Sequence, residues 1–272
     1  MASGPLRFIG RRLARFLSKS RDVEVHPATS PAHLVEATLE PGDVLLIEGT
    51  SRFSTAIKYL TQSTWSHAAL YVGDVIDPPG IVGDRRVLIE ADINEGVRAI
   101  PFSMYAGWHS RICRPVGLTE DERSRVIHFM IARLGYQYDV KNILDLVRYL
   151  VQTPPVPARW KRRMLALGSG DPTRAICSSL IAQAFQSIRY PILPEVEVTE
   201  SEDPYCVGAE CREEIHRIRH HSLFAPRDFD VSPYFDVIKP RIAQGFDFHE
   251  LNWVDPETDE DARPPPVQLG PQ

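Results

Sequence analysis

The chain has 272 residues, of which 43% are hydrophobic and 25% are charged, a composition typical of a soluble globular protein with an ordinary core. Its net charge of −5 argues against nucleic acid as a partner of the whole chain. Four cysteines are too few for a disulfide scaffold, so we expect folding without disulfides, and nothing in the composition calls for a cofactor.

The first 21 residues are basic and contain no acid. Apolar residues recur at helical spacing from Leu6 to Leu17, which predicts an amphipathic helix over 6–19. Such a helix is typical of peptides that lie on an anionic membrane surface, although packing against the domain itself is an open alternative. On the membrane interpretation, the expected contacts are Arg7, Arg11, Arg12, Arg15 and Phe16.

Residues 22–40 are expected to be a linker, because they include two prolines and several small polar residues. The N-terminal segment has no uninterrupted apolar region followed by a cleavage site, and no run of 18 apolar residues occurs. We therefore expect a cytoplasmic location. If the predicted helix at 6–19 binds the membrane, the protein would be attached peripherally to its inner face.

A block of short strands is predicted next, within a domain that we place at residues 41–240. The continuous apolar run Val44–Ile47 predicts a strand buried on both faces, and residues 54–60 favour a short helix. Further strands are predicted at 67–72, 87–90, 97–100 and 110–113.

The second part of this domain is predicted to be helical. Thr119 and Glu122 form a capping-box pattern before an apolar-periodic run that ends near Gly135, and a second helix is expected over 140–151. Asp171 and Pro172 predict the start of another helix, whose buried face includes Leu180, Ile181 and Phe185. Residues 191–204 are expected to be a loop, and 241–272 an extension with an acidic, proline-rich disordered tail.

Three residues are candidates for chemistry. Cys177 falls in the first turn of the predicted helix, where free N–H groups and the helix dipole favour a thiolate. His67 begins a strand, and Glu90 ends the strand after it. Each has a plain structural interpretation: a small buried cysteine, a structural histidine and a solvated carboxylate. Together they form a nucleophile, a base and an orienting carboxylate.

The segments that carry these residues resemble a known family. Gly42-Asp43-Val44-Leu45-Leu46, the run from Ser66 to Gly73 and the run from Ile176 to Ile181 are similar to the circularly permuted, YiiX-like branch of the papain-like NlpC superfamily, with lecithin:retinol acyltransferases as distant relatives. The order His67, Glu90, Cys177 matches the permutation. The resemblance covers roughly residues 41–190.

The resemblance implies an α+β fold of the permuted papain-like (NlpC) type, with a small antiparallel sheet packed against helices. It also implies a cysteine hydrolase that cleaves a peptide-like amide through a thioacyl-enzyme. Lipid acyl hydrolysis or transfer by the same triad is the alternative, and a non-catalytic binding module is a second one. Tyr138 is a candidate oxyanion or substrate contact, with a packed core tyrosine equally open, and the Cys177 N–H is a candidate oxyanion donor.

One further cluster of residues could bind a metal. Cys206, Cys211, His216, His220 and His221 have zinc-ligand chemistry, but the short gap between the cysteines and the histidines is unlike a zinc finger. A histidine-rich surface segment is the preferred interpretation, so the sequence predicts no metal.

Overall fold

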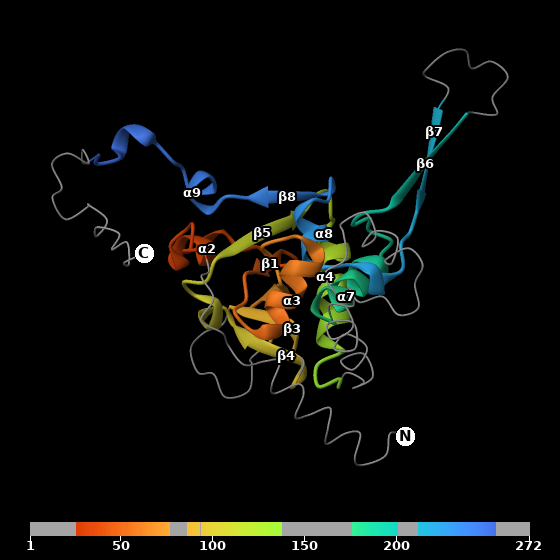
Figure 1. The fold of residues 1–272 in the computed structure, drawn as a ribbon, viewed down its shortest axis with the longest axis horizontal. Helices are drawn as coiled ribbons and strands as arrows, with labels where there is room; N and C mark the ends of the chain where they lie inside the picture. Colours follow the sequence, from red (N-terminus) through yellow and green to blue (C-terminus); the bar gives the residue numbers. More distant parts are fainter. Residues whose placement is uncertain (1–25, 77–85, 93, 138–175, 201–211, 254–272) are drawn as a thin grey trace, which may run out of the picture.

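The computed structural model describes residues 26–76, 86–92, 94–137, 176–200 and 212–253. Over these residues the chain is an α+β protein built around one sheet (Figure 1). The strands of this sheet are β1 (Val44–Ile47), β2 (His67–Gly73), β3 (Val87–Asp92), β4 (Gly96–Pro101), β5 (Ser110–Pro115) and β8 (Phe235–Ile238). The longer helices are α3 (Arg52–Thr61), α4 (Glu120–Ile131) and α7 (Ile176–Gln186).

The six strands are hydrogen-bonded in the order β4-β3-β2-β1-β5-β8, and every neighbouring pair is antiparallel. Strand β1 lies in the interior of the sheet and is buried at all four positions, as its continuous apolar run predicts. The five strands expected between residues 44 and 113 are therefore all present.

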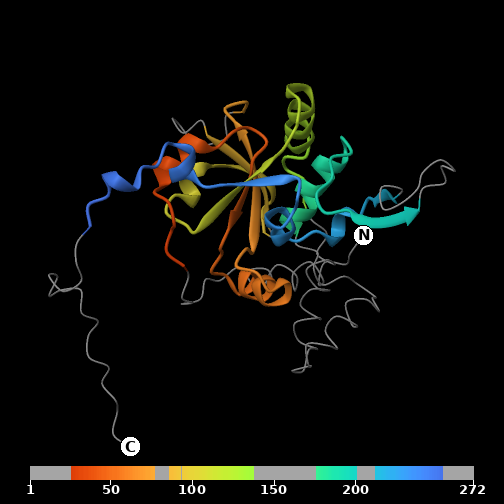
Figure 2. The same ribbon diagram turned by 90° about the horizontal axis from the view of Figure 1, so that it is seen from above.

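The sheet has an apolar core on each face. On one face, α4 and α7 pack over Val44, Leu46 and Leu70. On the other face, Leu45, Ile47 and Tyr71 are covered by the short helices α2 (Ala32–Thr38) and η1 (Phe102–Tyr105). Seen from above, α4 and α7 lie to one side of the strands and α2 to the other (Figure 2). This layering brings the start of α7 close to the ends of β2 and β3.

Local sequence explains where two helices begin. Thr119 and Glu122 form the predicted reciprocal capping box at the start of α4. At the start of α3, the Ser51 hydroxyl accepts a hydrogen bond from the Ser54 N–H at 3.0 Å. Only the capping residues of α4 could be recognised from the sequence, because a long apolar-periodic run follows them.

Two parts of the structure differ from the sequence-based expectations. Residues expected to be a loop contain β6 (Glu195–Glu200), which pairs with β7 (Arg212–Arg217) as a separate two-stranded sheet. That loop prediction is wrong because alternating Glu and Val residues at 195–198 form the edge of a hairpin. In addition, α2 forms within the segment predicted as a linker.

The remaining helices of the described chain are short. They are η2 (His221–Leu223), α8 (Pro226–Asp230), α9 (Pro240–Ala243) and η3 (Phe248–Glu250). The predicted helices at 6–19 and 140–151, the helix start at Asp171 and the tail beyond residue 253 lie outside the described residues. Among the residues that are described, no helix is long and apolar enough to cross a membrane.

Candidate active site

The sheet brings His67 and Glu90 together. His67 is the first residue of β2, and Glu90 of β3 pairs with Ala69, two residues further along β2. Side chains two apart along a strand share a face, so His67 and Glu90 are diagonal neighbours on one face. The His67 Nε2 atom lies 2.7 Å from Glu90 Oε2. This leaves Nδ1 of the same ring for another partner.

Glu90 is held from three sides. Its side chain is only 1% exposed. Arg98, its cross-strand partner on β4, places Nε 2.8 Å and Nη2 2.7 Å from Oε1. The Tyr105 hydroxyl of η1 donates to Oε2 at 2.5 Å. Burial raises the pKa of Glu90, but His67, Tyr105 and Arg98 outweigh burial and lower it to about 2. The carboxylate is therefore fixed and ionised at neutral pH.

Cys177 approaches the same histidine from a helix. It is the second described residue of α7 and is buried. The Ser178 hydroxyl donates to the Phe224 carbonyl oxygen at 2.7 Å, which anchors this end of α7. Burial lowers the pKa of His67, but the charges of Cys177 and Glu90 and hydrogen bonds to both raise it well above its ordinary value. The arrangement favours a protonated His67 imidazolium, which lies between Cys177 and the Glu90 carboxylate.

The three side chains face a cleft with a volume of about 410 Å³. One wall comes from the residues after β1, including Gly49 and Ser51, and another from Arg98, Tyr105 and Trp108. The Ser66 hydroxyl accepts a hydrogen bond from the Gly49 N–H at 2.9 Å. A Cβ atom at Gly49 would lie 2.3 Å from Ser54 Oγ and 3.0 Å from Ser66 Oγ, so only glycine fits this wall.

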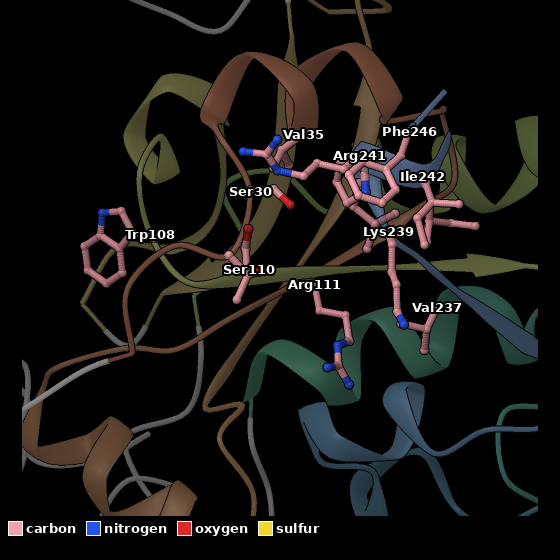
Figure 3. Close-up of a pocket in the computed structure, with 14 residues that line it drawn as sticks. Ser30, Val35, Trp108, Ser110, Arg111, Val237, Lys239, Arg241, Ile242 and Phe246 are labelled. Carbon is pink, nitrogen blue, oxygen red and sulfur yellow. The ribbon is translucent and has the colours of Figure 1, made fainter. Parts of the chain in front are cut away.

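A second cavity, of about 380 Å³, adjoins this cleft and shares Trp108 with it. Figure 3 shows Trp108 at one end and Arg241, Ile242 and Phe246 at the other. Its lining is mainly apolar, with side chains from α2, β5, β8 and α9. Two cations, Lys239 and Arg241, also line it.

The structure thus brings together three of the residues singled out in the sequence, Cys177, His67 and Glu90. Two neighbours were missed, Arg98 and Tyr105. Arg98 gives a signal, because it is a charged residue in an otherwise apolar strand that follows the strand of Glu90. Tyr105 gives none, since its role depends on how η1 folds over the sheet. Tyr138 and the predicted membrane contacts Arg7, Arg11, Arg12, Arg15 and Phe16 lie outside the described residues.

Comparison with known proteins bears on the first half of the chain. Residues 38–149 match the model of the permuted papain-like amidase enzymes, YaeF/YiiX, C92 family. The match includes His67 and Glu90, covers less than half of the chain and ends before Cys177. No curated protein matches the sequence.

Among solved structures, the chain is similar to the metalloprotein yiiX from Escherichia coli O157:H7 (DUF1105). The identity is 15%, the TM-score is 0.41, and the alignment covers 74% of this chain and 96% of that one. The match of residues 38–149 to the family model confirms the resemblance seen in the sequence: this part of the chain is similar to the permuted papain-like amidases of the YaeF/YiiX group.

Proposed function

We propose that the protein is a cysteine hydrolase that cleaves a peptide-like amide bond, with Cys177 as nucleophile, His67 as base and Glu90 as the residue that orients His67. The observation that carries the proposal is the convergence of these three side chains in one cleft, with Glu90 bound to Nε2 of His67. The amidase description of the matching family supports the reaction class, and the wider NlpC relationship is part of the same proposal.

The reaction follows from this geometry. The Cys177 thiol gives its proton to His67 Nδ1, and the thiolate attacks the carbonyl carbon of the substrate. The tetrahedral intermediate collapses as the C–N bond breaks, and the leaving amine takes the proton from His67. A water molecule, deprotonated by His67, then hydrolyses the thioester and regenerates Cys177. The Cys177 N–H is the proposed donor to the oxyanion, because helix-start N–H groups have no intrahelical partner.

Glu90 acts through His67 rather than on the substrate. Its bond to Nε2 requires the proton there, so that Nδ1 is free to accept the thiol proton. Arg98 and Tyr105 keep the carboxylate ionised and aimed at the ring. Burial of an unpaired carboxylate in this position would be destabilising, so Arg98 and Tyr105 are part of the proposed active site.

Lipid acyl hydrolysis or transfer is the second candidate, and one observation favours it. The apolar cavity of Figure 3 shares Trp108 with the cleft and is also lined by the cations Lys239 and Arg241. An acyl chain with an anionic head group would satisfy both features. The predicted amphipathic helix at 6–19 would then bring the cleft to a peripheral position on an anionic membrane.

A substrate panel separates the two reactions. The purified protein is incubated with γ-glutamyl and lysyl peptides and, separately, with a fluorescent acyl phospholipid, with Cys177→Ala as the control. Peptide cleavage without a fatty-acyl adduct on Cys177 supports amide hydrolysis. Release of fatty acid, or an acyl adduct on Cys177 detected by mass spectrometry, supports the lipid reaction instead. Equal turnover by the wild type and Cys177→Ala would contradict both reactions, and no turnover of any substrate by the wild type would leave a binding module.

A further inference from the structure

A second cluster of polar side chains lies next to the proposed catalytic cleft. Glu48 directly follows β1, His109 directly precedes β5, and His26 lies near the start of the described chain. The Nδ1 atoms of His26 and His109 each lie 2.9 Å from the same atom, Glu48 Oε2. All three of these atoms lie within 4.8 Å of one another. Two imidazoles and a carboxylate therefore converge on one point.

Potential hydrogen-bond donors crowd one oxygen of Glu48. Glu48 Oε1 already accepts from Lys58 Nζ at 2.9 Å. Oε2 also accepts from the backbone N–H of His26 at 3.2 Å, so with the two imidazoles it faces three potential donors. A carboxylate has about four acceptor positions over its two oxygens, roughly two on each. Three nitrogens, two of them from imidazoles, therefore crowd one oxygen that offers roughly two acceptor positions, while the other oxygen has one partner.

We propose that His26 Nδ1, His109 Nδ1 and Glu48 Oε2 bind one divalent cation of the zinc class. Two imidazoles and one carboxylate are a ligand set that Zn²⁺ accepts, whereas Ca²⁺ and Mg²⁺ prefer oxygen ligands throughout. Binding displaces the Nδ1 protons of the two histidines, and each ring keeps a proton on Nε2. Glu48 is 3% exposed, and Lys58 holds its other oxygen, so the carboxylate is pre-oriented to offer Oε2.

The surroundings leave room for the rest of the coordination shell. A cavity of about 530 Å³ opens beside the three ligands and is lined mainly by polar groups. The cation nearest the ligands is Lys58, whose charge Glu48 balances, while Arg111 of the same cavity is paired with Asp230 at 2.5 Å. Water from this cavity would complete the coordination of the ion.

The position of the site couples it to the cleft. Ile47 and Gly49, the neighbours of Glu48, both line the cleft, and so does Trp108, the neighbour of His109. The Glu48 N–H also donates to the His109 carbonyl oxygen at 3.0 Å. An ion on these ligands would tie His26 to the wall of the cleft and hold that wall in place.

Zinc titration of the full chain tests the proposal. Thiols compete for zinc, so all measurements use a background with Cys177→Ser, Cys206→Ser and Cys211→Ser. This background is inactive under the proposed mechanism, and the readout is therefore independent of the proposed function. After removal of metal by a chelator, the protein is titrated with Zn²⁺ in competition with a chromophoric chelator. We expect one equivalent of zinc to bind and to raise the melting temperature.

Two histidine variants decide the outcome. His26→Ala should weaken the affinity for this zinc ion by at least the roughly 10–100-fold that loss of an outer-shell partner causes. It should also abolish the rise in melting temperature on zinc binding. His33→Ala, an exposed histidine of α2, is the matched control and should bind zinc normally. The exposed position of His26 makes its replacement compatible with folding, which circular dichroism checks, and His109→Ala is the second variant. Equal zinc binding by the background and both ligand variants would overturn the proposal.

Discussion

The substitution Glu90→Gln keeps the shape of the side chain but removes its charge. The amide has one acceptor oxygen, while Glu90 now accepts from Arg98 on one oxygen and from His67 and Tyr105 on the other. If the amide oxygen faces Arg98, the amide NH2 faces His67 Nε2 and donates to it. The imidazole proton then moves to Nδ1, which can no longer accept the proton of Cys177.

The size of the effect follows from two sources. A change to the wrong tautomer lowers turnover by up to about 10⁴-fold in serine proteases with the corresponding substitution. For stability, the pKa of Glu90 is about 2 against an ordinary 4.5, a difference equivalent to about 3 kcal/mol of unfolding free energy at neutral pH. We expect Glu90→Gln to fold, to lose up to this amount of stability, and to lose turnover by a factor of about 10²–10⁴.

The assay is the pH–rate profile for hydrolysis of a p-nitrophenyl ester, which needs no knowledge of the natural substrate. Glu90 contributes to the raised pKa of His67, so the variant should lose its alkaline limb at a lower pH than the wild type. Glu120→Gln removes an exposed carboxylate paired with Arg123 and should match the wild type. Full turnover by Glu90→Gln with an unchanged alkaline limb would refute the orienting role.

Three further results are expected. The contribution of Glu48 and Glu90 to the unfolding free energy should be full above pH 4.5 and should fall towards pH 2, because folding lowers their pKa values to about 2; urea titrations that give equal stability at pH 3 and pH 6 would contradict this. Gly49→Ala should cost about 1–3 kcal/mol by displacing Ser54 and Ser66, and a thermal melt equal to wild type would count against the tight wall. The full chain should sediment with anionic liposomes at low salt, whereas a chain beginning at Asp22 should not, because each basic residue contributes about 1 kcal/mol to membrane binding. Equal sedimentation of the two chains would contradict the prediction of a membrane-binding helix.

Much of the sheet could be predicted because its signals are local. The apolar run at Val44–Ile47 and the capping box at Thr119 each fix an element with few competing interpretations. The residues of the proposed triad could also be predicted, since His67 and Glu90 lie at strand ends and Cys177 lies near a helix start. Strand pairing then decides that His67 and Glu90 share a face, which periodicity alone does not reveal.

The remaining features depend on contacts between distant segments. Tyr105 reaches Glu90 only because η1 folds over the sheet, 15 residues along the chain. The cluster at Glu48 joins residues 22 and 61 positions away, and neither histidine lies in a recognisable motif. The β6–β7 hairpin was missed because its strands carry more charged than apolar residues, with Ile215 the one apolar residue of β7, and because the residues between them lack the turn pattern that marks a short hairpin.

The central claim is that Cys177 is the nucleophile and that His67 activates it. Its most direct test is labelling with less than one equivalent of iodoacetamide at neutral pH, followed by peptide mass spectrometry. We predict that the label appears on Cys177 before the other cysteines, including Cys113, whose pKa burial raises. We also predict that His67→Ala slows the labelling of Cys177. Equal labelling of all four cysteines, or an unchanged rate in His67→Ala, would contradict the account.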